Sequence, residues 1–271
     1  MFATVLDPNN PGSIDLLEKC QFKDKMSVIQ MDVTNEEMIN KCYEKVKNEL
    51  EGNGHKLWAL VNNAGILAAG HTEWGQFDDY LKTFDVNVFG VVRVTRKFLP
   101  LIRPARGRIV IVASLTGRIT LDNIGVYSMS KSAIISYSDV LRREMRKFKV
   151  KVSTIEPGLF KTLQFFTVDT IVEHTWNRTD EQIRQIYGQQ YIENQLKQLK
   201  THKTLLRGNN NIDIVINDMI DAIVSKNPKR SYKPINTFLL FWIPIFLPVV
   251  PQGLIDFVFG LIDRTVPDAM K

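Results

Sequence analysis

Short apolar runs rich in β-branched residues recur along the chain and are separated by longer segments with helical periodicity. Runs without polar alternation are typical of strands that a parallel sheet buries on both faces. The runs that we interpret as strands are Phe2–Asp7, Ser27–Met31, Leu57–Gly65, Arg108–Ser114 and Lys151–Glu156. This pattern predicts an α/β protein built on a parallel sheet.

The segment 126–147 has a helical pattern and carries a candidate catalytic pair. Its apolar residues fall near i, i+3 and i+4 spacing, no proline interrupts it, and cations crowd its last turns. Tyr127 and Lys131 are four residues apart, so they share one face of this helix. A nearby ammonium favours the phenolate, and we expect Lys131 to lower the pKa of Tyr127 from about 10. Tyr127 is then a candidate general acid or base, and the alternative is a chance match of two common residues.

Polar and small residues stand where two of the predicted strands end. Ser114 ends one strand, and the sequence Asn62, Asn63, Ala64, Gly65 ends another. Ligands of open α/β sheets bind outside the carboxyl ends of the strands. The Ser114 hydroxyl is therefore a candidate for holding a substrate oxygen while Tyr127 exchanges its proton.

These motifs, at these intervals, resemble the short-chain dehydrogenase/reductase family over residues 1–235. The resemblance implies a Rossmann-like doubly wound parallel sheet in a single domain. It also implies a catalytic tetrad of Asn87, Ser114, Tyr127 and Lys131. In such a tetrad Tyr127 is the acid/base and Ser114 orients the substrate oxygen. Lys131 tunes the phenol and holds the nicotinamide ribose, and Asn87 supports a water-linked proton relay.

The resemblance further implies a set of cofactor-binding positions. Those along the cofactor are Asn62, Asn63, Ala64 and Gly65; those at the adenine are Asp32 and Val33; those at the nicotinamide carboxamide are Pro157, Gly158 and Thr162. Asp7 ends the opening strand, where a carboxylate accepts hydrogen bonds from the ribose hydroxyls and repels a 2'-phosphate, which favours NAD over NADP. The alternative for Asp7 is a solvated turn residue ahead of Pro8.

The chain departs from the family at the start of the fold. A complete dinucleotide-binding unit begins with a strand, a glycine-rich turn and a helix whose N–H groups hold the pyrophosphate. No such glycine cluster precedes Asp7, so we expect an N-terminally truncated fold. Losing that first strand would leave two unpaired strand edges inside the sheet.

Composition narrows the class of protein. A chain of 271 residues with 44% hydrophobic residues suits one large domain. The net charge of +6 is accompanied by no basic stretch with interleaved aromatic residues, so we expect no nucleic-acid partner. The two cysteines and four histidines have no metal-ligand spacing, and we expect no metal site.

The region 159–210 is interpreted as a lid over the substrate. It opens with an apolar and aromatic stretch that includes Phe160 and Leu163, which are candidate substrate-binding residues. A large apolar pocket favours a lipid-like alcohol over a sugar or a small acid. The alternative is that this stripe belongs to the core.

Residues 236–271 form an apolar C-terminal extension to the domain. The part 238–262 is nearly uncharged over its first thirteen residues, which is short of the roughly 20 that span a bilayer, so we interpret it as an interfacial membrane anchor. Packing against the same chain or a dimer partner is the alternative.

These features narrow the resemblance to the retinol and hydroxysteroid dehydrogenases, which are related to the 3-hydroxybutyrate dehydrogenases. Resemblance to that branch implies a location at the endoplasmic reticulum membrane, and the alternatives are a mitochondrial or a cytoplasmic location. It also implies that the chain can form a homodimer. The main hypothesis is an NAD-dependent oxidoreductase that interconverts an alcohol and a carbonyl on a lipid-like substrate. The competing hypothesis is a catalytically silent, truncated relative that binds a lipid or a protein partner.

Overall fold

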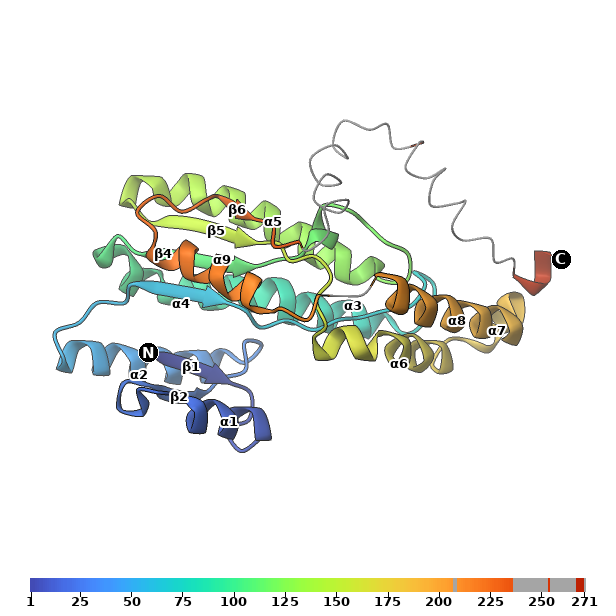
Figure 1. Ribbon diagram of the computed structural model, residues 1–271, viewed down its shortest axis with the longest axis horizontal. Coiled ribbons are helices and arrows are strands. Elements are labelled where there is room, and N and C mark those ends of the chain that lie inside the picture. Colours follow the sequence, from blue (N-terminus) through green and yellow to red (C-terminus); the bar gives the residue numbers. More distant parts are fainter. Residues whose placement is uncertain (207–208, 236–252, 254–266, 271) are drawn as a thin grey trace.

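The computed structural model describes residues 1–206, 209–235, 253 and 267–270, and within them the chain forms an α/β fold with parallel strands (Figure 1). The strands fall into two sheets, one of order β1-β2 and one of order β3-β4-β5-β6. Every strand pair is parallel. The prediction of an α/β fold with a doubly wound parallel arrangement is confirmed, but the sheet is divided.

The N-terminal sheet consists of two strands and carries one helix on each side. Its elements are β1 (Phe2–Val5), α1 (Pro11–Lys19), β2 (Ser27–Gln30) and α2 (Glu36–Gly52). Asn10 and Asn35 begin the two helices, because each side-chain oxygen accepts a hydrogen bond from a backbone N–H of the first turn. The strands are in register from Phe2 opposite Ser27 to Val5 opposite Gln30.

The larger sheet contains the strands on which the candidate site depends. They are β3 (Ala59–Asn62), β4 (Arg108–Val112), β5 (Lys151–Ile155) and β6 (Ser231–Tyr232). The first four residues of β4 are fully buried, as expected for a central strand covered on both faces. The predicted strands at 27–31, 57–65, 108–114 and 151–156 are thus confirmed, each with a slightly shorter hydrogen-bonded core.

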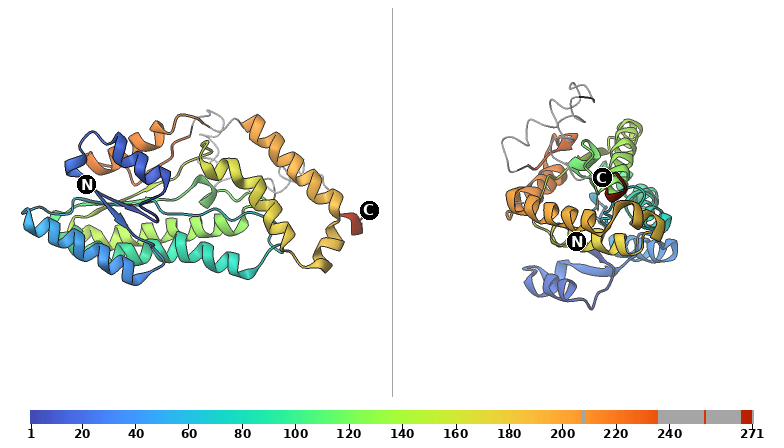
Figure 2. Two further views of the ribbon diagram at one scale, coloured as in Figure 1. Left: turned by 90° about the horizontal axis from the view of Figure 1, so that it is seen from below. Right: turned by 90° about the vertical axis from the view of Figure 1, so that its right-hand side faces the viewer.

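Helices lie on both sides of the two sheets (Figure 2). On one face lie α2, α4 (Val91–Ile102) and α5 (Gly125–Met145), and on the other lie α1 and α9 (Asp213–Val224). Alternate residues of β4 show the two faces: Ile109 and Ile111 pack with α4 and α5, whereas Val110 packs with α9. The helix predicted over 126–147 is confirmed as α5, which ends in a short 3₁₀ turn at Arg146–Phe148.

The remaining helices lie at the carboxyl end of the sheet. They are α3 (Phe77–Phe84), continued by a π-helical turn at Asp85–Gly90, and the three helices α6 (Leu163–Asn177), α7 (Glu181–Tyr187) and α8 (Gln189–Leu206). An aromatic cluster holds the last three against the loop before α3; it contains His71, Trp74, Trp176, Tyr187 and Tyr191.

Among the described residues, no helix is both long and apolar enough to cross a bilayer. The segment 238–262, for which an interfacial anchor is predicted, lies outside the described residues except for Gly253. The membrane interpretation of that segment stays a prediction.

Candidate active site

Ser114 stands two residues beyond the last residue of β4, at the carboxyl edge of the sheet. Its side chain is buried, and its Oγ accepts hydrogen bonds from the Thr116 backbone N–H at 3.2 Å and from the Thr116 hydroxyl at 2.9 Å. These bonds make Ser114 the cap of a 3₁₀ turn, Leu115–Gly117. The serine hydroxyl is therefore fixed in position before any ligand binds.

Tyr127 lies in the first turn of α5, and its hydroxyl is close enough to the Ser114 side chain for the two to interact. Burial raises the pKa of Tyr127 above 10, and the interaction with Ser114 opposes that rise only in part. The phenol is thus protonated at neutral pH in the chain without a ligand.

Lys131 lies one turn further along α5 and is buried, with 4% of its surface exposed. Its Nζ donates a hydrogen bond to the Val112 carbonyl at 3.0 Å and lies 5.5 Å from the centre of the Tyr127 ring. Burial lowers the pKa of Lys131 to about 8. The expected face-sharing of the two side chains is present, but the expected fall in the pKa of Tyr127 is wrong for the ligand-free chain. Desolvation of the phenol is the largest effect, and the ammonium lies beside the ring and bonds to a backbone oxygen.

Asn87 lies in the π-helical turn Asp85–Gly90, a helix form that often marks functional sites. Its Oδ1 accepts from the Ile66 N–H at 2.8 Å, and its Nδ2 donates to the Ile66 carbonyl at 2.9 Å and to Ser130 Oγ at 3.0 Å. A Cβ at Gly65 would lie 3.3 Å from Asn87 Oδ1 and 3.5 Å from Lys131 Nζ. The loop after β3, the π turn and α5 therefore meet at one point, and only a residue without a side chain fits there easily.

Comparisons with known proteins give the family of this chain. A family model described as short chain dehydrogenase matches residues 3–168. The chain belongs to the short chain dehydrogenase family. It is 38% identical over 256 residues to the 17-beta-hydroxysteroid dehydrogenase type 6 of Rattus norvegicus, a match that covers 93% of this chain and 78% of that protein. It is 37% identical over 236 residues to the retinol dehydrogenase 16 of Mus musculus, covering 86% of this chain and 72% of that protein. The predicted placement in the retinol and hydroxysteroid branch of this oxidoreductase family is confirmed.

Solved structures of short-chain dehydrogenases share the fold. A short chain dehydrogenase/reductase from Burkholderia phymatum in complex with NAD superposes with a TM-score of 0.66 at 21% identity, covering 98% of this chain and 86% of that one. ElxO with NADP bound superposes with a TM-score of 0.62 at 21% identity, covering 86% of this chain and 85% of that one. Structures of this fold thus hold NAD in one case and NADP in the other.

Apart from Tyr127 and Lys131 on α5, the positions predicted to contact a cofactor lie at the carboxyl ends of strands or in the segments that follow them. Asn62 is buried and donates to Thr95 Oγ1 at 3.0 Å, whereas Asn63 and Ala64 are exposed beyond it. Asp7 is exposed beyond β1, and its Oδ1 accepts from the Asn9 N–H at 2.9 Å. Asn62, Asn63 and Ala64 therefore lie at the carboxyl edge of the larger sheet, the edge beyond which Ser114 also lies. Asp7 lies beyond a strand of the separate N-terminal sheet.

The residues that follow β2 and β5 are held in place by hydrogen bonds and close packing. Asp32 Oδ1 accepts from the N–H and the hydroxyl of Thr34, each at 2.8 Å, and Val33 packs so closely on Gly90 that a Cβ there would lie 2.6 Å from Val33. The Gly158 N–H donates to the Pro234 carbonyl at 3.1 Å, and the Pro157 carbonyl accepts from Leu115 at 2.9 Å.

Thr162 is exposed at the start of α6, and the two predicted substrate-binding residues precede and follow it. Phe160 is buried in the cluster formed by α9, β4 and β5, so its side chain is packed as core. Leu163 begins α6, and its side chain lies outside the described part of the chain.

A cavity of about 300 Å³ lies between the loop after β3, α3 and α6. The apolar residues that line it include Ile66, Leu67 and Ile171, and the polar ones include His174 and Arg178. Arg178 is held there by an ion pair with Asp79 at 3.0 Å. Two lining residues connect this cavity to the predicted tetrad: Ile66, whose backbone is bound by Asn87, and Val126, which precedes Tyr127 in α5.

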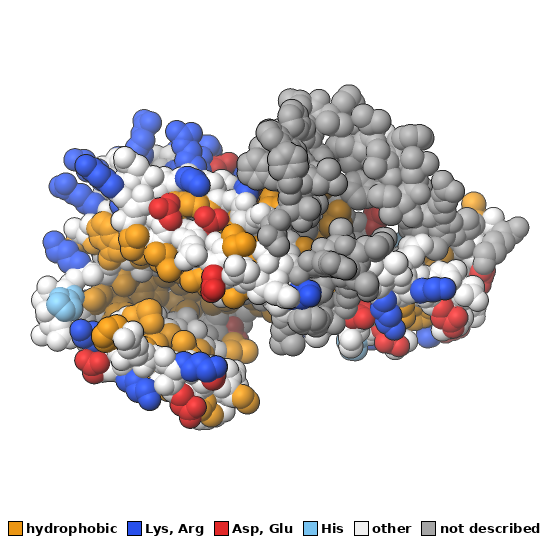
Figure 3. Space-filling view, viewed as in Figure 1, with side chains coloured by type: hydrophobic (Ala, Val, Ile, Leu, Met, Phe, Trp, Pro, Cys, Tyr) orange, Lys and Arg blue, Asp and Glu red, His pale blue; other side chains and the backbone are white. Residues whose placement is uncertain are grey.

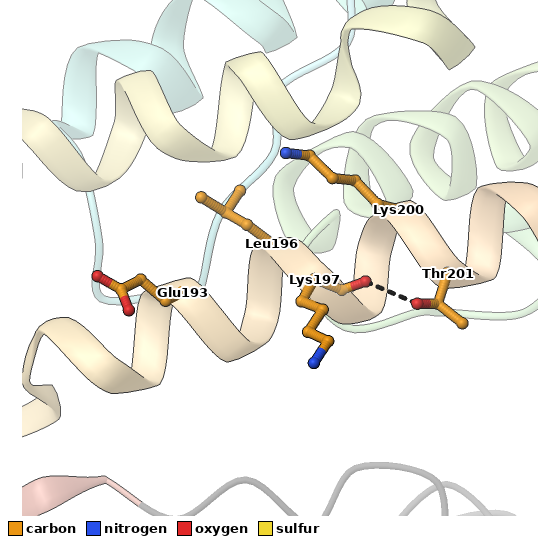
Figure 4. A pocket seen from close by; sticks show the side chains of 5 residues that line it. All are labelled: Glu193, Leu196, Lys197, Lys200 and Thr201. Carbon is orange, nitrogen blue, oxygen red and sulfur yellow. Dashed lines mark hydrogen bonds between the residues drawn. The ribbon is translucent and has the colours of Figure 1, made fainter.

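A second hollow lies along α8 (Figure 4). It is lined by Glu193, Leu196, Lys197, Lys200 and Thr201, all from that one helix, and none of them is a predicted site residue. This hollow shares no lining residue with the Tyr127 site.

Sequence reasoning missed one charged pair beside the site, Arg118 and Glu156. Glu156 is fully buried, and both of its carboxylate oxygens accept hydrogen bonds from Arg118. A glutamate that directly follows an apolar strand and precedes Pro157 is the signal that could have indicated it, because glutamate is rarely fully buried without a partner.

Proposed function

We propose that this chain interconverts an alcohol and a carbonyl on a lipid-like substrate, a hydroxysteroid or a retinoid, with NAD as its cofactor. The observation that supports this best is the position of the Tyr127 hydroxyl next to the buried Ser114, with the buried ammonium of Lys131 at 5.5 Å from the centre of the Tyr127 ring. The substrate class rests on the hydroxysteroid and retinol dehydrogenases among the relatives and on the partly apolar cavity that Ile66 and Val126 help to line.

The chain's own residues fit one half of a dinucleotide well. Gly65 leaves space beside Asn87 and Lys131, where a ribose would sit, and Lys131 Nζ uses one of its three N–H donors on Val112. Pro157 and Gly158 would lie along the nicotinamide. A bound nicotinamide would supply the hydride acceptor or donor.

Tyr127 moves the proton in this proposal. Because burial keeps the phenol protonated at neutral pH, Tyr127 begins as a donor and gives its proton to a carbonyl oxygen held by Ser114. In the opposite direction the Lys131 ammonium stabilises the phenolate form of Tyr127, which then takes the proton of a carbinol hydroxyl and becomes the neutral phenol.

NAD is preferred in this proposal because Asp7 ends β1 with an exposed carboxylate. A carboxylate there repels a 2'-phosphate and accepts hydrogen bonds from ribose hydroxyls. Asp7→Asn removes the charge with little change of shape. It should therefore weaken the preference for NAD over NADP by at least about tenfold in kcat/KM, which corresponds to about 1.4 kcal/mol.

The decisive test of the catalytic proposal is Tyr127→Phe. It removes the acid/base hydroxyl and should lower kcat on a hydroxysteroid or retinol by at least about 10³-fold, with an unchanged circular dichroism spectrum. Tyr43→Phe is the control, since Tyr43 lies on α2 and its ring packs on Phe98, away from Ser114 and Tyr127. Retained turnover in Tyr127→Phe would reject the assignment.

One observation favours the second candidate function, a lipid- or partner-binding protein without catalysis. In the described residues, the helix that follows β1 opens at Asn10 and Pro11 and carries no glycine-rich turn for a pyrophosphate. Titration of the chain with NADH, followed by the fluorescence of the cofactor, separates the two candidates. A working enzyme should show saturable binding below 1 mM, on the order of typical KM values, and a silent relative should show none.

We further propose that residues 238–262 bind the surface of the endoplasmic reticulum membrane, because this segment is apolar and nearly uncharged. The full chain should float with liposomes of endoplasmic reticulum lipid composition, and a variant ending at residue 235 should stay at the bottom of the gradient. Equal flotation of both would overturn this proposal. Chemical cross-linking of the same two variants would report on the predicted homodimer.

A further inference from the structure

One stripe of side chains from α6 lines the cavity of about 300 Å³ to which Ile66 and Val126 also belong. Its members are spaced by three and four residues, so they share one face of the helix. They are Ile171, His174, Thr175 and the capping residue Arg178. Ile171 and Arg178 are about 10 Å apart along a helix axis, so the wall changes from apolar to charged within a single cavity.

Hydrogen bonds and close packing fix this stripe against the loop that follows β3. The Thr175 hydroxyl donates to the Ala69 carbonyl at 2.7 Å, and the Gly75 N–H donates to the Thr179 hydroxyl at 3.0 Å. A Cβ at Gly70, whose φ is +137°, would lie 2.7 Å from Thr175 Cγ2. The chain itself therefore holds this wall in place, and its side chains are preorganised for a ligand.

The guanidinium of Arg178 is oriented by one partner and keeps donors to spare. Its Nη1 donates to both carboxylate oxygens of Asp79, at 3.0 Å and 3.3 Å. Asp79 belongs to the capping box of α3, where its Oδ2 accepts from the Gln76 N–H at 3.2 Å. Among the described residues, Nε and Nη2 of Arg178 have no hydrogen-bond partner. Since an arginine has five N–H donors, the three at these two nitrogens remain for an oxygen in the cavity.

The two ends of the cavity differ in burial as well as in chemistry. Val126, next to Tyr127, is buried, whereas the Arg178 side chain is 38% exposed. Figure 3 shows charged side chains of both signs over α6 and α8, the helices at this end of the molecule. Lys82 and Arg178, the cations in the described lining, carry donors only, so the outer end suits an oxygen acceptor better than an amine or an alkyl group.

We propose that this cavity receives the end of the substrate remote from the reacting carbinol, and that Arg178 donates hydrogen bonds to an oxygen at that end. The inference rests on the proposed function, because a substrate held at Ser114 and Tyr127 would extend past Val126 toward Arg178. It selects hydroxysteroids that carry an oxygen at both ends. The remote end of retinol is a hydrocarbon ring, which would cover the Arg178 donors without giving them a partner.

Binding measured without turnover tests this assignment. The probes are a 17β-hydroxysteroid with a keto group at carbon 3 and the same steroid without that keto group. Each is titrated into the Tyr127→Phe chain, with and without NADH, and binding is followed by tryptophan fluorescence, since Trp74 lines the cavity. The keto steroid should bind at least about tenfold more tightly, because a hydrogen bond from a charged donor contributes that much or more.

Variants of the ion pair assign the preference to Arg178. Arg178→Met removes the donors, so it should abolish the preference for the keto steroid and leave the affinity for the other steroid nearly unchanged. Arg178→Lys keeps the charge and should retain part of the preference. Asp79→Asn is the matched control, because it breaks the same ion pair but leaves the arginine in place, and the preference should persist.

A cavity-filling variant locates the binding site. Ala68→Phe occupies space in the lining and should weaken the binding of both steroids. No saturable binding of either steroid, an unchanged preference in Arg178→Met, or a preference lost in Asp79→Asn would overturn the assignment. None of these readouts depends on turnover. Failure here is therefore distinct from failure of the proposed function, which retained turnover in Tyr127→Phe would indicate.

Discussion

The Arg118 guanidinium holds the Glu156 carboxylate with two hydrogen bonds, from Nε to Oε2 at 3.1 Å and from Nη2 to Oε1 at 2.9 Å. Glu156 directly follows β5, and the Thr154 hydroxyl donates to the same carboxylate at 2.8 Å. Arg118 ends the turn that Ser114 begins. The pair therefore fastens the serine turn to the end of the neighbouring strand.

Arg118→Ala should destabilise the fold because it leaves the Glu156 carboxylate buried without its cation. Breaking a buried pair costs about 3–5 kcal/mol, and we expect only about 2–3 kcal/mol because the Arg118 side chain is 39% exposed and water reaches the site. Urea denaturation measures the free energy of unfolding. Arg142→Ala, which breaks the more exposed pair with Asp139, should cost less than about 1 kcal/mol, and equal losses in the two variants would contradict the prediction.

Lys131 should make the stability of the chain depend on pH. Burial lowers its pKa from 10.5 to about 8, so between these values the unfolded chain binds more protons than the folded chain. The penalty for a buried charge is full below pH 8, and stability should rise as the pH increases from 8 to 10.5. At 1.36 kcal/mol per pKa unit, the total change is on the order of 3 kcal/mol.

Lys131→Met, which lacks the titrating group, provides the reference for this effect. The difference in free energy of unfolding between the variant and the parent chain should favour the variant most at pH 7 and shrink toward pH 10. A difference that stays constant over this range would show that the ammonium is not desolvated.

Gly117→Ala should disturb the contact between the serine turn and α5. A Cβ at Gly117 would lie 2.8 Å from the Lys131 carbonyl carbon and 2.7 Å from Ile135 Cδ1, and the backbone atom cannot move aside easily. Overpacking of this kind costs about 1–3 kcal/mol, and it should also lower kcat through displacement of Lys131. The matched control is Gly52→Ala at the end of α2, where a Cβ meets nothing within 4 Å. Thermal denaturation of that control should show no loss of stability.

Asn87→Ala should lower stability as well as turnover, because Asn87 connects the Ile66 backbone to Ser130. Each buried backbone group left without a partner costs about 1–3 kcal/mol, so we expect a loss of about 2–4 kcal/mol. Asn62→Ala removes a single hydrogen bond to Thr95 and should cost about 1 kcal/mol. If Asn87→Ala lowered kcat but left the free energy of unfolding unchanged, the prediction would be contradicted, and Asn87 would act in the reaction alone.

The local features of the candidate site could be predicted from the amino-acid sequence. The apolar runs predict the strands, and the spacing of Tyr127 and Lys131 predicts their common face on α5, because helix and strand periodicity are fixed by the covalent geometry of neighbouring residues. The position of Ser114 beyond β4 follows in the same way, as does the expectation of two unpaired strand edges.

The contacts between segments that are far apart in the sequence could not be predicted from the sequence. The pairing of Arg118 with Glu156 spans 38 residues, and the packing of Phe160 in the core depends on where α9 lies. The stripe of α6 is encoded in the sequence, but only the packing of α6 against α3 shows that Arg178 meets Asp79 beside the cavity.

The sequence by itself determined the α/β elements, the family to which the chain is similar, and the order of the candidate catalytic side chains along it. Only the tertiary structure decided that the pKa of Tyr127 rises and that the pKa of Lys131 falls to about 8. The reason is physical: a pKa depends on how much water the folded chain removes from a group, and segments far apart in the sequence carry out that removal.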